Sequence, residues 1–417
     1  MQPTLSLRTR PGRAVVGLAG MLGAVALVAA GCSSDSGGAA EKPGATASAG
    51  GATKVDVTLT AASGTDACEL STASVPAGPV TFTVTNKDSA AINEVELLLN
   101  NRIVGEKENL APGLAAVSFT STLDGGSYEV YCPGAEKDTV AFTVTGQAAT
   151  SPTGSVQAVL AQGTAEYSTF VQSQLAAMVV GVDNLKKAVD SGDLGTAQKA
   201  YATARPFYEK IESDVDGFVL PGFKATDNKG NLDYLVDMRA SSLDPAVGWH
   251  GFHAVERDLF GEKKIDAGTK KYAAELATNV AKLRDLATSL AFKPEDLANG
   301  AAGLLEEVQA NKITGEEEKY SHLDLATFAG NVEGAEQAFA DLQPGMEKID
   351  PDLTAQVTAQ FDAVKSTLKT YQDAAVLGGY ELWTPQLRRT DAAKLSQSIQ
   401  ALQQPLSKVA EKVATAQ

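Results

Sequence analysis

The stretch Gly248-Trp249-His250-Gly251-Phe252-His253-Ala254-Val255-Glu256-Arg257-Asp258-Leu259-Phe260 carries two of the three histidines in this 417-residue chain. If the stretch is helical, His253 and Glu256 stand three residues apart on one face, beside apolar side chains. Helical bundles build metal sites by pairing His and Glu at this spacing with carboxylates from facing helices. The alternative is a packed core histidine next to a solvated glutamate. The stretch therefore predicts a helical architecture and leaves both interpretations of His253 open.

Helical periodicity surrounds this stretch on both sides. Apolar residues recur at three- and four-residue steps from Val156 to about Ser191, where Ser191-Gly192 ends the pattern. Asp193 or Thr196 can cap a second helix, which we expect to run to about Asp214. Later helical patterns cover about 249–260, 269–290, 295–312, 322–340, 352–376 and 391–414. Many helices without strands between them predict an all-α bundle over residues 155–417.

A second pair of acids repeats the spacing of the first stretch. Glu209 and Glu212 lie three residues apart in Arg205-Pro206-Phe207-Tyr208-Glu209-Lys210-Ile211-Glu212, which we read as helical. Two ionised glutamates at this spacing repel each other. A bound cation would relieve the repulsion, and so would Lys210 and Arg205 in solvent.

Two further segments offer carboxylates near the first stretch. Asp233 and Asp237 precede it, and the acids of residues 316–318 run into His322 and Asp324. Charged runs are usually solvated. These acids form a site only if several helices turn them inward together.

Ahead of the helices, the hydrophobic period is two. Apolar and polar residues alternate in short runs from Thr53 to about Thr145, with turn residues such as Pro112-Gly113 between them. Short strands at this spacing predict a small β-sandwich over residues 53–146. Residues 146 to about 154 read as a linker to the bundle.

The N-terminal end predicts export. Three arginines precede the apolar run Ala14 to Ala30, and small residues stand directly before Cys32. This pattern is typical of a signal peptide over residues 1–31, with Cys32 as the lipidated first residue of a bacterial lipoprotein on the outer face of the cell membrane. The alternative is an uncleaved membrane anchor. Residues 32–52 are rich in Gly, Ala and Ser and predict a flexible tether.

The charge of the chain restricts its partners. The formal net charge is -16, and it becomes -19 once residues 1–31, with three arginines and no acids, are removed. An acidic surface of this kind argues against nucleic acid or anionic lipid as a partner, and it attracts cations.

Two cysteines remain for the β region. In an oxidising compartment, Cys68 and Cys132 are expected to form a disulfide. The alternative is that they join carboxylates around a second metal, and we take Glu69, Glu94 and Glu106 as the candidates. The run Tyr128 to Gly134 (YEVYCPG) resembles a cupredoxin, in which a cysteine after a late strand binds copper. A blue-copper centre needs two imidazoles and a thiolate, and residues 53–146 contain no histidine.

Separated motifs carry a resemblance to a known family. The segments YEKIES (208–213), GFHAVE (251–256) and KITGEEEKYSHLDLATFAGNVEGAEQAF (312–339) resemble imelysin-like iron-uptake lipoproteins of the EfeO/EfeM type. The segments VGEKENLAPG (104–113) and YEVYCPG are similar to the cupredoxin-like domain of the two-domain members. The resemblance implies a cupredoxin-like β-sandwich followed by an imelysin-like helical bundle.

The resemblance also implies a function. It implies a protein without enzymatic activity that captures iron (Fe2+ or Fe3+) and passes it to a membrane permease, alongside a haem peroxidase. Copper or ferric iron is a candidate occupant of the β region. The metal ligands carried over by motif are Glu209, Glu212, Asp237, His253, Glu256 and one acid of residues 316–318, for which we take Glu318. Residues 227–231 make the segment between Glu212 and His253 longer than we expect for this family. Asp233 therefore stays an alternative to Asp237 as a ligand. Carboxylates with one imidazole suit iron, and capture is expected to weaken at acid pH.

Two other classes of function compete with iron capture. A metallopeptidase would need HExxH, which is absent, or HxxEH, in which Arg257 stands at the place of the second histidine. A module that binds polyanions would need a bridging divalent cation, because the chain itself is acidic.

Overall fold

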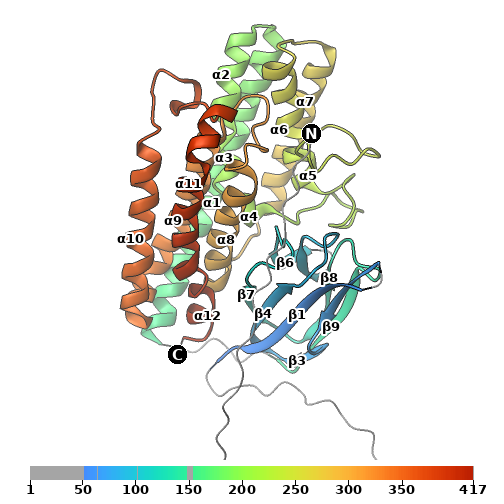
Figure 1. Ribbon diagram of the computed structural model, residues 1–417, viewed down its shortest axis with the longest axis vertical. Helices are drawn as coiled ribbons and strands as arrows, with labels where there is room; N and C mark the ends of the chain where they lie inside the picture. Colours follow the sequence, from blue (N-terminus) through green and yellow to red (C-terminus); the bar gives the residue numbers. More distant parts are fainter. Residues whose placement is uncertain (1–50, 63, 101, 148–153, 417) are drawn as a thin grey trace, which may run out of the picture. The chain divides into compact units, whose positions relative to one another are not determined.

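Two β-sheets form the first part of the chain in the computed structural model, which describes residues 51–62, 64–100, 102–147 and 154–416 (Figure 1). The predicted signal peptide, Cys32 and nearly all of the predicted tether lie outside the described residues. The strands are β1 (Thr53–Ala62), β2 (Thr65–Leu70), β3 (Ser74–Pro76), β4 (Gly78–Asn86), β5 (Val95–Leu99), β6 (Arg102–Lys107), β7 (Val117–Leu123), β8 (Gly126–Tyr131) and β9 (Thr139–Thr145).

The alternation of apolar and polar residues builds the core between these sheets. One sheet has the order β2-β1-β4-β7 and the other β3-β9-β8-β5-β6. In β1, the side chains of Val55, Val57 and Leu59 are fully buried, whereas Lys54 before them and Asp56 between them are exposed. A period of two puts alternate residues on opposite faces of a strand. The predicted β region is therefore confirmed.

A disulfide links the two sheets. Cys68 lies in β2, and Cys132 directly follows β8 of the other sheet; their sulfur atoms are bonded. A disulfide leaves no thiolate to bind a metal. Of the two alternatives for these cysteines, the structure therefore has the disulfide.

Helices form the rest of the described chain, so the predicted order of β region and then helical region is confirmed. The α-helices are α1 (Ser155–Ser191), α2 (Leu194–Ala204), α3 (Pro206–Glu209), α4 (Glu212–Val215), α5 (Leu232–Asp237), α6 (Gly251–Glu256), α7 (Ala267–Ala287), α8 (Pro294–Glu307), α9 (Asp324–Ile349), α10 (Pro351–Lys369), α11 (Pro385–Leu406) and α12 (Val409–Ala414). Two π-helical segments, η1 (Arg257–Gly261) and η2 (Val308–Lys312), and the short η3 (Leu377–Gly379) complete them.

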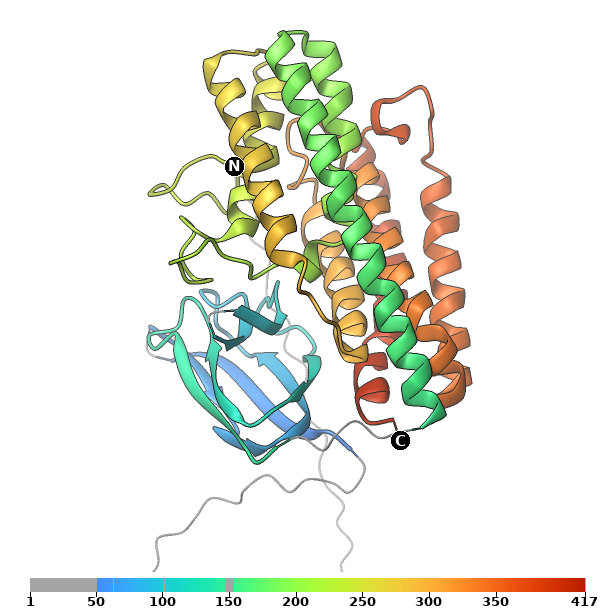
Figure 2. The ribbon, with the colours of Figure 1, turned by 180° about the vertical axis from the view of Figure 1, so that it is seen from behind.

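Helix α1 is the longest element of this region. It has 37 residues and packs against α2, α7 and α9 (Figure 2). Its buried side chains, including Tyr167, Val171, Leu175 and Met178, follow the three- and four-residue steps seen in the sequence. The long helices form a scaffold, and the candidate ligands lie on the short helices α3, α4, α5 and α6 and in the loop after η2.

Several predicted helix bounds are wrong. The helix expected over 352–376 ends at Lys369. The helix expected over 391–414 begins at Pro385 and is divided into α11 and α12. The helix expected to run to Asp214 stops at Ala204, because Pro206 lacks an N–H and favours a new helix start. Separate short helices α3 and α4 follow. The pattern over 249–260 is α-helical only over α6 and then widens into η1. Helix α9 continues past residue 340 to Ile349 in spite of Pro344, because Leu342 and Met346 extend its buried face.

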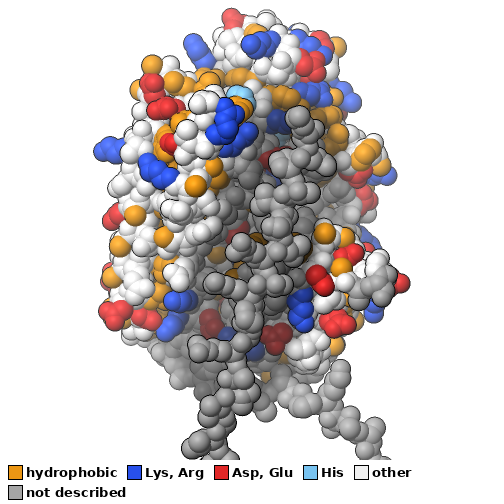
Figure 3. Space-filling view, in the orientation of Figure 1, with side chains coloured by type: hydrophobic (Ala, Val, Ile, Leu, Met, Phe, Trp, Pro, Cys, Tyr) orange, Lys and Arg blue, Asp and Glu red, His pale blue; other side chains and the backbone are white. Residues whose placement is uncertain are grey.

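Acidic and basic side chains are both scattered over the face drawn in Figure 3. Among the described residues, none of the helices combines the length and the apolar character needed to cross a bilayer.

Candidate metal centre

His253 is held in one orientation from both sides of its ring. Its side chain is buried, and Nδ1 lies 2.9 Å from Glu256 Oε2. The other oxygen, Glu256 Oε1, accepts hydrogen bonds of 2.7 Å from the backbone N–H groups of Tyr320 and Ser321. A carboxylate that fixes Nδ1 in this way directs Nε2 toward a metal in many metal sites. Glu256 therefore orients the imidazole.

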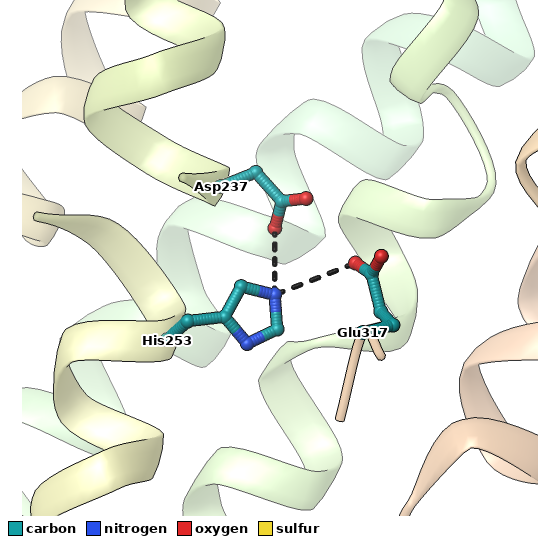
Figure 4. Close-up of side chains that lie close together, drawn as sticks. All are labelled: Asp237, His253 and Glu317. Atoms are coloured by element: carbon teal, nitrogen blue, oxygen red, sulfur yellow. Dashed lines mark hydrogen bonds and ion pairs between the residues drawn. The ribbon is translucent and has the colours of Figure 1, made fainter. Parts of the chain in front are cut away.

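Two carboxylates face the free side of the ring. His253 Nε2 lies 3.6 Å from Asp237 Oδ1 and 3.4 Å from Glu317 Oε1 (Figure 4). Gly251 lets α6 approach α5, which carries Asp237: its φ is 71°, and a Cβ there would lie 2.1 Å from Val236 O. Only glycine fits this close approach. The three side chains come from α6, α5 and the loop after η2, and all are buried.

Glu209 of α3 extends this group of acids. It is fully buried, and its Oε2 lies 2.9 Å from Lys312 Nζ at the end of η2. The backbone around it meets α9 closely, since a Cβ on Gly334 would lie 2.2 Å from Lys210 O. We name Glu209, Asp237, His253 and Glu317 the candidate cluster. Carboxylate oxygens with one imidazole nitrogen match the ligands that iron and other harder cations prefer.

Two buried cations pair with the carboxylates of the candidate cluster. Arg205 Nη2 lies 2.5 Å from Glu209 Oε1, 2.7 Å from Asp237 Oδ1 and 2.5 Å from Glu317 Oε1. Lys312 Nζ lies 3.3 Å from Glu317 Oε1. Both cations are 1% exposed, so the alternative in which Arg205 lies in solvent does not hold. Acids packed this closely inside a protein need such partners, because an unpaired buried charge is strongly destabilising.

The remaining predicted acids lie beside the cluster. Glu212 is in α4, and its Oε2 is 3.9 Å from Lys312 Nζ without a hydrogen-bond partner among the described residues. Glu318 contacts Arg205 Nε at 3.3 Å through Oε1 and accepts a hydrogen bond of 2.5 Å from Ser321 at Oε2. An oxygen of Glu318 also comes within 4.8 Å of ligand atoms of His253 and Glu256. Glu318 therefore remains a candidate on the Nδ1 side of the ring.

The sequence left two choices of ligand open, between Asp233 and Asp237 and among the acids of residues 316–318. Asp237 lies in the cluster, whereas Asp233 accepts a hydrogen bond from the Tyr208 hydroxyl. Glu317 faces His253 Nε2, whereas Glu316 accepts a hydrogen bond from the backbone N–H of Ser241. Glu317 is thus the acid of residues 316–318 nearest to the imidazole, although we took Glu318 from the sequence.

Burial and charge shift the titration of these groups. Burial alone would lower the pKa of His253, but its hydrogen bonds to Glu256 and Glu317 raise it well above the usual value. Burial tends to raise the pKa of Glu317, but Lys312 and Arg239 together hold it well below its usual value. Burial and the neighbouring Glu256 raise the pKa of Glu318 to about 7. Protons and cations therefore compete for the same buried atoms.

The acids predicted for the β region do not gather around the cysteines. Glu69 is exposed, and Glu106 shares a hydrogen bond with Asp216 of the helical region. Glu106 and Asp216 line a cavity of about 850 Å³ together with Glu108, Glu212, Asp233 and Glu307. All described residues belong to one compact unit. Glu94 raises the pKa of the neighbouring Glu96, whose Oε2 is buried without a hydrogen-bond partner among the described residues.

Glu96→Gln is expected to stabilise the protein at alkaline pH. Burial, and then the charges of Glu94 and Asp216, raise the pKa of Glu96 to about 9 from 4.5. Between these two values the folded state binds a proton that the unfolded state has lost, so wild-type stability falls as pH rises. The loss is at most about 1.4 kcal/mol per pH unit.

Glutamine does not titrate, so the advantage of the Glu96→Gln variant should grow across this window. Urea denaturation at about pH 5 and about pH 8 measures the difference, with Glu69→Gln on an exposed side chain as the control. An advantage that shrinks with rising pH would contradict the expectation.

Comparison with known proteins identifies a family and several relatives. The imelysin family model (Peptidase_M75) matches residues 163–409. The proteins named iron uptake system component EfeO of Escherichia coli O1:K1, Escherichia coli strain K12 and Shigella flexneri are each 34% identical to this chain over 350 residues. The match covers 83% of this chain and 87% of each relative.

Proposed function

Because this chain belongs to the imelysin family and is an EfeO-type component of an iron-uptake system, we propose that it captures iron at the candidate cluster. The observation that carries the proposal is the orientation of His253. Nδ1 is held by Glu256, and Nε2 faces Asp237 Oδ1 and Glu317 Oε1 inside the protein. Glu209 supplies a third carboxylate beside them.

The donor atoms fit iron better than a soft metal. Three carboxylates and one imidazole suit Fe2+ or Fe3+, whereas copper(I) and iron–sulfur clusters are typically held by thiolates. Glu256 orients the His253 ring and does not bind the metal, because both of its oxygens are occupied by His253 and by two backbone N–H groups. Of the predicted ligands, Glu212 and Glu318 would join only after a side-chain movement.

Iron binding by the purified protein tests this function. We expect calorimetric titration with Fe2+ without oxygen to show one tight site. Because hydrogen bonds to Glu256 and Glu317 raise the pKa of His253 above its usual value, and a metal binds only the deprotonated ring, affinity should fall as pH drops. Absence of binding, or affinity that does not change with pH, would contradict the proposal.

The remaining steps follow from the resemblance. We propose that the protein is exported, anchored through lipid on Cys32, and passes iron to a membrane permease that works with a haem peroxidase. What supports this is the name of the relatives, iron uptake system component, and the export pattern of residues 1–31. The cupredoxin-like character of the β region and the division at residues 53–146 and 155–417 stay predictions.

We propose that the protein is not an enzyme, although the family name includes the word peptidase. The chain lacks HExxH, and Arg257, which follows Glu256, pairs with Asp258 at 2.8 Å. Turnover of peptides that stops on addition of a chelator would instead support the metallopeptidase alternative.

A further inference from the structure

Resting on the iron-capture function, we propose that Arg205 is an internal counter-cation that iron displaces. In this view, capture exchanges a guanidinium group for a metal ion. The buried carboxylates are paired before and after the exchange, but with different cations.

The first argument is the position of one nitrogen atom. Arg205 Nη2 is within 2.7 Å of one oxygen from each of Glu209, Asp237 and Glu317. It also lies 3.4 Å from His253 Nε2. The ligand atoms proposed for iron therefore already surround a single positively charged group.

The second argument is that these acceptors do not match the shape of a guanidinium. Arginine usually binds carboxylates through two parallel N–H groups, as a planar fork. Here three carboxylate oxygens converge on Nη2, and Nη1 is buried without a hydrogen-bond partner among the described residues. Nε has only an ion-pair contact of 3.3 Å with Glu318 Oε1. Oxygens that converge on a point suit a spherical cation better than a fork.

The third argument is that both cations cannot be present in this position. Small divalent ions bind carboxylate oxygens at about 2.0 to 2.2 Å. An ion bound to the oxygens of Glu209, Asp237 and Glu317 would therefore be in contact with Nη2, and the two positive charges would repel each other. Iron and the present position of the guanidinium exclude one another.

Aromatic rings flank Arg205 on the helix junction that carries it. Arg205 is the junction between α2 and α3, where Pro206 begins a new helix. Its Cζ lies 5.2 Å from the centre of the Phe252 ring and 5.6 Å from that of Tyr208. Aromatic faces stabilise a guanidinium that has left its carboxylates. Lys312 contacts the other oxygen of Glu209 at 2.9 Å and also lies 3.3 Å from Glu317 Oε1.

Such an exchange would select cations by charge. A monovalent ion that replaces Arg205 gains nothing in charge and loses its water, whereas a divalent or trivalent ion gains at least one unit of charge against the same carboxylates. Arg205 is thus a specificity-determining residue for the proposed capture of iron, and it sets a threshold that Na⁺ and K⁺ do not pass.

Arg205→Met tests the exchange, because methionine keeps the apolar stem and removes the competing charge. We expect the purified variant to bind Fe2+, without oxygen, about tenfold tighter than wild type or more, because the three ion pairs of Arg205 no longer have to be broken. Its metal-free form should melt at a lower temperature, since its carboxylates lose a partner. Potassium should raise its melting temperature but not that of wild type. Arg257→Met is the matched control, because Arg257 pairs with Asp258 outside the cluster.

The outcomes separate this inference from the function on which it rests. Wild-type binding of Fe2+ with equal or weaker binding by Arg205→Met overturns the exchange alone. No binding by either protein overturns iron capture and the exchange with it. If Arg205→Met does not fold, wild-type protein with nitrogen-labelled arginine decides by NMR. Addition of Zn2+ must then shift the signal of one buried guanidinium group, and an unchanged signal overturns the exchange.

Discussion

Replacement of His253 by alanine is expected to weaken Fe2+ binding by more than about 100-fold. Loss of a residue that only hydrogen-bonds a metal ligand typically lowers metal affinity by about 10- to 100-fold, and loss of the ligand itself should cost more. The imidazole is the single nitrogen ligand of the candidate cluster, and its Nε2 faces two carboxylates. Without it, the carboxylates of Asp237 and Glu317 lose a shared partner. Titration calorimetry with Fe2+ measures the loss.

His250→Ala is the matched control for this experiment. His250 is three residues earlier and also pairs with a carboxylate, since its Nδ1 lies 3.5 Å from Glu275 Oε2. That pair lies outside the cluster, so iron binding should not change. Equal loss in both variants, or no loss in His253→Ala, would remove the site from His253. His253→Gln, which keeps a polar side chain, serves if the alanine variant does not fold.

The second large effect is expected from Glu256→Gln, which should weaken Fe2+ binding by about 10- to 100-fold while the protein stays folded. The glutamine oxygen can accept the hydrogen bonds from Tyr320 and Ser321 that Glu256 Oε1 accepts now. The glutamine N–H₂ group then faces His253 Nδ1, which must become the acceptor. The proton moves to Nε2, and the ring loses the lone pair that would bind iron.

The control for this variant is Glu275→Gln, which makes the same change in the His250 pair. For Glu275→Gln we expect unchanged iron affinity and an unchanged melting temperature. Full iron affinity in Glu256→Gln would show that the tautomer of His253 does not matter. A large drop in melting temperature would instead assign Glu256 a structural role.

The order of β region and helices could be predicted because both patterns are long and periodic. The alternation in β1 and the three- and four-residue steps in α1 each report on one buried face. The break between α2 and α3 was missed, although Pro206 marks it. Proline is also tolerated inside α9 at Pro344, so a single proline does not decide whether a helix ends.

The candidate site was less predictable, because its side chains come from short helices and a loop. Glu209 and Glu212 were expected on one helical face. Helix α3 ends at Glu209 and α4 begins at Glu212, so the two side chains come from separate helices and approach each other at Lys312. The choice of Glu317 over Glu318 depends on the loop after η2, where no period helps.

The cations of the site left no clear signal in the sequence. A basic residue among acids is usually solvated, and composition does not distinguish such a residue from Arg205 or Lys312. The spacing of Arg205 and Glu209, four residues apart, is compatible with an ion pair on a helix surface. Only the packing of α3, α5 and the loop after η2 shows that the pair is buried.

The two π-helical segments make the centre sensitive to chain length. Segment η1 directly follows α6 and begins at the residue after Glu256. Segment η2 directly follows α8 and ends at Lys312. A π-helical turn holds about one residue more than an α-helical turn, and one residue rotates everything after it by about 100°. A relative that had lost one residue in either turn would keep every acid in its alignment and yet present a different set of them to the ion.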